Sequence, residues 1–445
     1  MAQADAGYVR AAGAGAWTEV LYGGDAGAFI NSLVAALPAS GGEIIIGPSS
    51  AQYRFTGGLG SISKPVQVIC APGANFQPPA AGGGAVGGML RFTSGGAGST
   101  WTGGQFNEAS PYLMTTPRIM IDVQNGAHDV HLRDVVFSIV NTVASTQSCR
   151  AVNVAGSSAD SVVTGFVMDG CRFRCNSTRE ATSNTGTDHL GWACIEMEHV
   201  THAKVRGCTF WGGATPQPSS TGNIRALLIW KDVLFSHFTG NSGCGLLGLS
   251  DEQISGTDVI DAGASGLIEI SNATSEGHHS TISDNNFEVV TGYSFIRQIG
   301  GNYGSIDNNH FGRIQMTDAV VRLLSSGSGL SDATAIIGNK WHNVSAPSQI
   351  RNGGYAVRVS GQQNVIIDGS HFTLVNKQGA YERVPLRVDN GCRDVVIGST
   401  QIGFNQTATN QFAPFTYIIW EGPDAYSNTK LLFPTNFAKT PFIRT

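Results

Sequence analysis

Short runs of alternating apolar and polar residues fill most of the chain, and one such run recurs as a word. ISDNNF at 282–287 returns as IDNNHF at 306–311. Looser copies of the word end at residues 137, 173, 210, 238, 341, 372 and 402, and the last three intervals are 30, 31 and 30 residues. A period of this length with strand-type alternation predicts stacked coils of strands and turns. The expected fold class is all-β, a right-handed parallel β-helix (solenoid), the hand following the bias of parallel crossover connections.

The repeated word predicts how successive coils stack. Equal positions in neighbouring coils lie about 4.8 Å apart. The last position of the word is therefore expected to form an aromatic stack in the core: Phe287, Phe311, Trp341 and Phe372. Two residues earlier, an asparagine ladder is expected at Asn285, Asn309 and Asn339, where side-chain amides can bond to one another and to turn backbone. We interpret both sets as scaffold.

A second pattern, apolar–x–apolar, opens each coil and predicts one outward-facing column, since alternate residues of a strand point to opposite faces. The column reads Asp122, Asn153, Glu196, Glu269, Arg297, Arg322, Arg358 and Arg387. A coil around Trp230 fits between Glu196 and Glu269. The column changes from acidic to basic, and like charges at this spacing require anions, solvent or a neighbouring chain.

The N-terminal part predicts a cap for the first coil. Asp25 is the expected N-cap of a short helix whose apolar residues from Phe29 to Leu37 follow helical spacing, and Pro38 ends it. The expected domains are an N-terminal arm at 1–20, a capped β-helix at 21–405 and a C-terminal capping or oligomerisation segment at 406–445, where many aromatic residues break the repeat.

The order GD…AF…LVAALPASGGEIIIGPSSAQYRFTGGLGSISKPVQVICAPGA at 24–74 resembles the opening module of the pectate-lyase-like superfamily. Many bacteriophage tailspikes and polysaccharide depolymerases belong to it, and the I-x-x-N-x-F words resemble its β-helix repeat. The resemblance covers roughly residues 20–405 and implies the fold and a polysaccharide ligand. It transfers no catalytic residue, because those residues differ among members, and the chain departs from the commoner G-D-G-x-x-D-D-T opening.

Composition removes several classes of partner. The net charge of −5 and a charged fraction of 13% show no basic stripe, so nucleic acid is not expected. No run approaches the ~20 apolar residues of a membrane span, and no signal peptide is visible. The eight cysteines fit no zinc pattern, and the histidines lack a third ligand at fixed spacing, so neither metal nor cofactor is expected. The expected location is a virion tail or the extracellular space, after synthesis in the cytoplasm.

Three functions remain open. The first is a tailspike-like depolymerase that binds and cleaves a bacterial surface polysaccharide by glycoside hydrolysis. The second is a non-catalytic receptor-binding or structural spike, and the third is a lyase or epimerase acting on a uronic-acid polymer. The arginines of the column favour an anionic glycan in each case, because guanidinium groups bind carboxylates in bidentate fashion. An alternative for these arginines is a solvated or intersubunit face.

Glycoside hydrolysis requires two carboxylates flanking the scissile bond, and the expected catalytic residues are Glu196, Glu198 and Glu269. The expected substrate-binding residues are Trp230, Lys231, Asp251, Arg297 and Arg322, with the Trp230 indole as a platform for a sugar ring. The alternative is that the acids only solubilise a strand face. The arginine column and the aromatic C-terminal segment also predict a homotrimer, with possible attachment to a virion tail through the N-terminal arm.

Overall fold

The protein forms two compact units, which are described separately. Unit 1 comprises residues 1–214 and 219–228, and unit 2 comprises residues 215–218 and 229–445. The computed structural model describes residues 4–78, 88–108, 119–139, 148–175, 191–212, 224, 226–247, 266–271, 279–300, 303–316, 318–325, 331–344, 355–375, 386–389, 391–399, 401–405, 418–421, 429–432 and 442–444. No helix in these ranges is long and apolar enough to cross a membrane.

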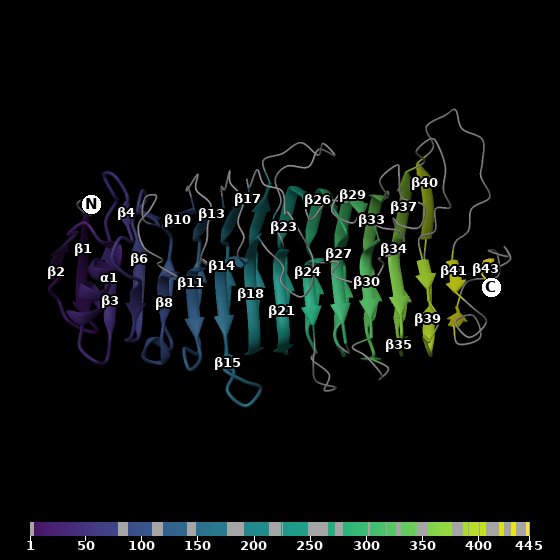
Figure 1. Cartoon of the computed structure of the whole chain (residues 1–445), viewed down its shortest axis with the longest axis horizontal. Coiled ribbons are helices and arrows are strands. Elements are labelled where there is room, and N and C mark those ends of the chain that lie inside the picture. The colour runs from purple at the N-terminus through teal and green to yellow at the C-terminus, as the bar shows by residue number, and fades with distance from the viewer. Residues whose placement is uncertain are drawn as a thin grey trace. The chain divides into compact units, whose positions relative to one another are not determined.

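Unit 1 is a parallel β-helix with three sheets, here named A, B and C (Figure 1). Sheet A runs in the order β2 (Thr18–Leu21), β1 (Ala6–Ala11), β3 (Gly42–Ile46), β6 (Val66–Cys70), β9 (Thr100–Thr102), β12 (His131–Arg133), β16 (Val167–Asp169) and β19 (Lys204–Arg206). Sheet B runs in the order β4 (Tyr53–Arg54), β7 (Asn75–Gln77), β10 (Gln105–Glu108), β13 (Val136–Ile139), β17 (Arg172–Cys175) and β20 (Thr209–Trp211). Sheet C runs in the order β5 (Gly60–Ile62), β8 (Gly88–Phe92), β11 (Ile119–Gln124), β14 (Ser148–Ala155) and β18 (Gly191–Thr201), with β15 (Val163–Thr164) beside β18.

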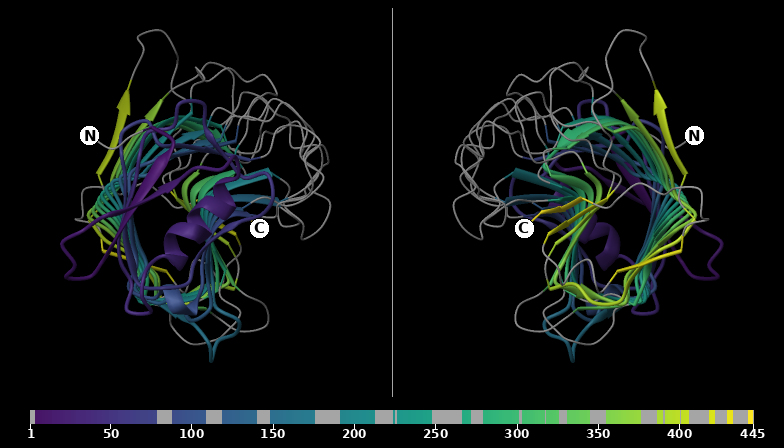
Figure 2. Two further views of the ribbon diagram at one scale, coloured as in Figure 1. Left: turned by 90° about the vertical axis from the view of Figure 1, so that its left-hand side faces the viewer. Right: turned by 90° about the vertical axis from the view of Figure 1, so that its right-hand side faces the viewer.

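The first coil of unit 1 is covered by the helix α1 (Ala26–Ala35), as the sequence predicts (Figure 2). Asp25 is its N-cap, and the Oδ2 atom of Asp25 accepts a hydrogen bond from the Ala28 N–H at 3.0 Å. The apolar face of the helix, including Phe29 and Ile30, is buried. Residues 6–21 supply β1 and β2, which pair antiparallel with each other, while β1 also pairs antiparallel with β3. A 3₁₀ turn, η1, lies at Ser94–Gly96.

Unit 2 repeats the same three-sheet coil. Sheet A runs in the order β22 (His237–Thr239), β25 (Thr281–Ser283), β28 (Ser305–Asp307), β32 (Ala335–Ile337), β36 (Ile366–Asp368), β39 (Val395–Ile397) and β42 (Thr429–Leu431). Sheet B runs in the order β23 (Ser242–Leu247), β26 (Asn286–Gly292), β29 (His310–Met316), β33 (Lys340–Val344), β37 (His371–Val375) and β40 (Gln401–Asn405). Sheet C runs in the order β24 (Gly266–Ser271), β27 (Ser294–Ile299), β30 (Ala319–Leu324), β34 (Tyr355–Ser360), β38 (Leu386–Val388), β41 (Ile418–Glu421) and β43 (Phe442–Arg444). A small pair joins β31 (Ser331–Asp332) to β35 (Gln362–Gln363), and β21 (Ala226–Leu234) has residues in both units.

The repeated word forms the interior of unit 2, as predicted. The Nδ2 atom of Asn285 donates to Oδ1 of Asn309 at 2.9 Å, and Nδ2 of Asn309 donates to Oδ1 of Asn339 at 2.9 Å. Each amide also bonds turn backbone; for example, Nδ2 of Asn309 donates to the Ile282 carbonyl. The buried ring of Phe311 stacks on Trp341 with centroids 6.0 Å apart, whereas Phe295 lies between Phe287 and Phe311. The ladder and the stack confirm the predicted coil register.

Candidate functional site

The predicted outward column exists in register on sheet C of each unit. In unit 1 Asp122 pairs with Asn153, which pairs with Glu196. In unit 2 the column is Glu269, Arg297, Arg322, Arg358 and Arg387, each opposite the next. In both units most side chains of the column are buried, whereas the sequence predicts an exposed column.

Trp230 is not the exposed platform that the sequence predicts, because its side chain is 0% exposed. Positive φ angles in and just after β18 and β21 show how the two strands align. Left-handed residues occur at His199 in β18 and His202 just after it, and at Asp232 in β21 and Phe235 just after it, with the same spacing. Aligning these positions places Trp230 at the site of Met197, which belongs to the inward set of its strand, and moves the neighbouring isoleucine into the outward position. The indole therefore packs in the core, one residue out of the predicted register.

Glu196 is held by an arginine. Its carboxylate is 2% exposed and accepts hydrogen bonds from Arg150, from Nε to Oε2 at 2.5 Å and from Nη2 to Oε1 at 3.1 Å. The parallel, two-bond geometry is the strong form of an arginine–carboxylate pair. Two coils further back, Asp122 accepts from Arg91 Nε at 3.1 Å and from Asn153 Nδ2 at 2.9 Å. Asp122 and Glu196 thus both have cationic partners.

Two other predicted site residues are more exposed than Glu196. Glu198 and Lys231 are half-buried, and each makes contacts with the rest of the chain. Asp251 and its loop lie outside the described residues. Among the described residues, no group of three His, Cys, Asp or Glu side chains is arranged to hold a metal ion.

Glu269 in unit 2 has a looser environment than Glu196. It is 8% exposed, and its Oε1 atom lies 3.8 Å from Nη1 of Arg297, which is longer than a hydrogen bond. Its Oε2 atom is buried, and no described residue donates a hydrogen bond to it. A buried carboxylate oxygen without a donor is costly, so such an oxygen in a folded protein requires an explanation.

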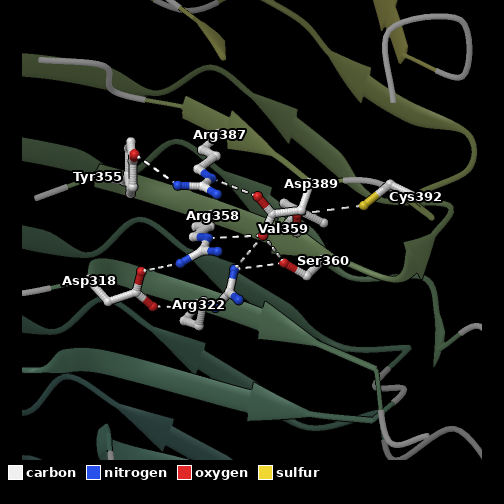
Figure 3. A network of polar contacts seen from close by, with 9 residues as sticks. All are labelled: Asp318, Arg322, Tyr355, Arg358, Val359, Ser360, Arg387, Asp389 and Cys392. Atoms are coloured by element: carbon white, nitrogen blue, oxygen red, sulfur yellow. Dashed lines mark hydrogen bonds and ion pairs between the residues drawn. The ribbon is translucent and has the colours of Figure 1, made fainter. Parts of the chain in front are cut away.

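Arg322 belongs to a buried network that the sequence did not reveal (Figure 3). We call this the sheet C network, and its charged members are Asp318, Arg322, Arg358, Arg387 and Asp389. Asp389 Oδ2 lies 3.1 Å from Arg322 Nη1 and accepts from Arg358 Nε at 2.9 Å. Its Oδ1 accepts from Arg387 Nε at 2.6 Å, and the Ser360 hydroxyl also donates to it at Oδ2.

Asp318, directly before β30, completes the network. Its Oδ1 accepts from Arg358 Nη1 at 2.9 Å, and its Oδ2 forms an ion pair with Arg322 Nε at 3.3 Å without hydrogen-bond geometry. Arg387 Nη1 donates to the Tyr355 hydroxyl at 3.2 Å. The stacked arginines thus share two carboxylates, which offsets the repulsion expected from the sequence.

The charges of the network control its titration. Burial alone would raise the pKa of Asp389, but Arg358, Arg387 and Arg322 together with the Ser360 hydroxyl hold it at about 2. Burial opposes the charged form of Arg358, yet Asp318 and Asp389 raise its pKa above the ordinary value. These groups remain ionised at neutral pH, and Arg322, at 2% exposure, offers little surface for the predicted contact with substrate.

The similarity of this chain to known proteins lies in its fold. No family model matches the chain, and no curated protein matches it. The chain is similar in structure to phage tailspike proteins. One is the Dettilon tailspike protein, with 16% identity and a TM-score of 0.46 over 91% of this chain and 67% of that chain. Another is a mutant tailspike protein of E. coli bacteriophage HK620 in complex with a pentasaccharide, with 11% identity and a TM-score of 0.49 over 92% and 74%.

A third similar structure is that of a bacterial surface adhesin. PfbA, a surface adhesin of Streptococcus pneumoniae, matches with 11% identity and a TM-score of 0.48 over 86% of this chain and 89% of that chain. At these identities and scores, function has to be argued from the residues themselves.

Proposed function

We propose that the protein is a tailspike-like depolymerase that binds and cleaves a bacterial surface polysaccharide (capsule, exopolysaccharide or O-antigen) by carboxylate-assisted glycoside hydrolysis. The catalytic part of this proposal rests on one observation: the Oε2 atom of Glu269 is buried and accepts no hydrogen bond from a described residue. A general acid or base needs a carboxyl oxygen that is not already committed to a donor. Arg297, 3.8 Å from the other oxygen, can hold the carboxylate in place or pair with an acidic sugar.

In unit 1, Glu196 and Glu198 remain proposed catalytic carboxylates. Of these two, Glu198 is the more exposed, while the bidentate bond from Arg150 restrains Glu196. Lys231 and Arg297 are the proposed binding residues that remain partly exposed. The buried positions of Trp230 and Arg322 support a structural role for both.

A binding-only spike is the second candidate, and the pairing of Glu196 with Arg150 favours it. A carboxylate that is fully engaged by a guanidinium contributes to the fold and is poorly placed to transfer protons. A receptor-binding protein on the same scaffold would recognise the polysaccharide and leave it intact.

Incubation of the protein with capsular and lipopolysaccharide fractions separates these candidates. The proposal predicts new reducing ends without the ultraviolet absorbance of an unsaturated uronate. Reducing ends with that absorbance would mean that the enzyme is a lyase. Retained binding of a fraction without any new reducing ends would mean that the protein is a binding-only spike.

We also propose that the protein is a homotrimer in a virion tail, attached through residues 1–20. Exposed apolar side chains on sheet A of unit 2 support association: Ile337 and Ile366 are 42% and 43% exposed, and Leu432, just past β42, is 62% exposed. Light scattering at micromolar protein concentration tests this state. A monomer mass would overturn the proposed trimer without affecting the catalytic proposal.

A further inference from the structure

The outer face of sheet B in unit 1 carries an exposed tryptophan. Trp211 ends β20 with 53% of its surface exposed, whereas the neighbouring Phe210 is buried. Phe210 stacks on Phe173 of β17 with centroids 4.8 Å apart, which fixes these two residues as the inward set. Because side chains alternate along a strand, Trp211 must face outward. Tryptophan is enriched at binding interfaces, so Trp211 is a candidate contact for a ligand.

Arginines flank this tryptophan in the sheet. Arg174 of β17 is the register partner of Trp211, and Arg172 is the partner of Thr209. Neighbouring strands lie about 4.8 Å apart, so these four side chains form one patch. We call this patch the sheet B platform. All four residues are exposed.

The arginines of the sheet B platform have no acidic partner in the described part of the chain. Elsewhere in unit 1, Arg150 pairs with Glu196 and Arg206 pairs with Asp169, but neither Arg172 nor Arg174 forms an ion pair with a described residue. The register positions of this outward face in the preceding strands carry no acid: Asn75, Gln105, Asn107 and Ser138 are polar, and Val136 is apolar. The platform therefore presents positive charge that no described residue neutralises with an ion pair.

The uncharged neighbours of the platform are suited to hydroxyl groups. Asn107 and Ser138, which are each only 8% exposed, continue the register line of Arg174 and Trp211 along the sheet. Gln105 Nε2 donates to Asn107 Oδ1 at 2.6 Å, and Asn107 in turn donates to Asn75. Amides and hydroxyls beside an aromatic surface and a cation form the mixed lining that fixes the orientation of a small polar ligand.

We propose that the sheet B platform binds a carboxylated sugar unit of a polysaccharide, an inference that rests on the proposed function. The indole of Trp211 offers an apolar surface to the C–H face of a pyranose ring. The guanidinium of Arg174 or Arg172 binds the sugar carboxylate through two parallel hydrogen bonds, a geometry that lysine does not reproduce. This platform lies on a different sheet from the acids proposed for catalysis and would hold the chain during or between cleavage events.

Binding assays with named polymers test the platform. The probes are polygalacturonate, hyaluronate and alginate as carboxylated polymers, dextran as a neutral polymer and dextran sulfate as a non-specific polyanion. Wild-type protein should bind at least one carboxylated polymer and not dextran. Trp211→Ala and Arg174→Ala should each weaken that binding by about tenfold or more, as expected for an aromatic or arginine hot spot.

Arg133→Ala is the matched control, because it removes the same charge from an exposed position on sheet A of the same unit. It should leave affinity within about twofold, and all three variants should keep the wild-type unfolding midpoint, since exposed substitutions cost little stability. Three results would overturn the platform: no binding of any carboxylated polymer, full affinity in both platform variants, or equal losses in Arg133→Ala with dextran sulfate bound as well.

The platform and the proposed function can fail separately. If the wild type and both platform variants bind or cleave a surface polysaccharide fraction equally well, the platform is wrong and the proposed function stands. If the wild type neither binds nor cleaves any capsular or lipopolysaccharide fraction, the proposed function is wrong.

Discussion

The arginines on the outer faces of sheets B and C in unit 1 differ in whether they pair with a carboxylate. On sheet C, Arg91 and Arg150 each meet a carboxylate, in Asp122 and Glu196. On sheet B, Arg172 and Arg174 are exposed and form no ion pair with a described residue. The strands alternate in the same way in both sheets, so alternation decides only the direction of a side chain. Whether an arginine pairs within the fold or remains available to a ligand depends on two things: the presence of an acid in register with it and the burial of the face.

The sheet C network of unit 2 extends this contrast. Its arginines stack at the spacing of the coils, which would be repulsive without Asp318 and Asp389. Burial makes these pairs expensive to form and more expensive to break. We therefore assign the network to the fold and the exposed sheet B platform to recognition.

The largest expected effect concerns Glu269, whose Oε2 atom accepts no hydrogen bond from a described residue. Glu269→Gln should lower turnover of a cleaved polysaccharide by about 10²–10⁴, because the amide cannot exchange a proton. Reducing-end assays under saturating substrate measure this effect. The variant should retain glycan binding and its unfolding midpoint.

Glu196→Gln provides the comparison for that experiment. Its loss of the bidentate bond to Arg150 should lower the unfolding midpoint as well as any activity. Full turnover in both Glu269→Gln and Glu196→Gln would remove this site and move the search for the catalytic residues elsewhere.

The next effect concerns stability. Asp389→Asn removes the carboxylate shared by Arg322, Arg358 and Arg387, and should cost about 3–5 kcal/mol in the free energy of unfolding, as for other broken buried pairs. Denaturant unfolding measures the loss. Asp394→Asn is the control, because it removes the same charge from an exposed left-handed position that asparagine tolerates. Equal midpoints for the two variants would contradict the structural role of the network.

A smaller effect should appear on acidification. The pKa of Asp389 falls from an ordinary value of 3.8 to about 2 in the folded protein. Its stabilising contribution is therefore complete above pH 3.8 and is lost as the pH falls towards 2, because the unfolded chain takes up the proton first. The contribution is on the order of 2 kcal/mol.

Unfolding midpoints of wild type and Asp389→Asn between pH 5 and pH 2 check this dependence, and the wild type should lose more stability than the variant. Parallel curves for the two proteins would remove Asp389 from the acid response.

The sequence predicts the fold well because equal positions of the repeat stack on one another in successive coils. The asparagine ladder at 285, 309 and 339 and the alternation of each strand depend only on residues one coil apart. The position of Trp230 was missed because this strand is apolar at four consecutive residues, from Leu227 to Trp230, and all four are buried. Alternation therefore does not show which of Ile229 and Trp230 takes the outward position.

The candidate site was predicted less well, for a different physical reason. Burial of the outer face of sheet C and its pairing with Asp318 and Asp389 depend on residues just outside the repeated strand word. Trp211, in contrast, could have been found: it follows the inward Phe210 of the repeat, so alternation alone places it outside.

The most direct test compares Arg174→Ala and Arg358→Ala in the same two assays: affinity for a carboxylated polymer that the wild type binds, and free energy of unfolding in denaturant. Arg174→Ala should weaken binding by about tenfold or more with unchanged stability. Arg358→Ala, which leaves Asp318 and Asp389 short of a buried partner, should cost about 3–5 kcal/mol of stability and leave the affinity of the folded protein within about twofold. Unchanged binding in Arg174→Ala, together with lost binding in a folded Arg358→Ala, would contradict the division between a recognition platform on sheet B and a structural network on sheet C.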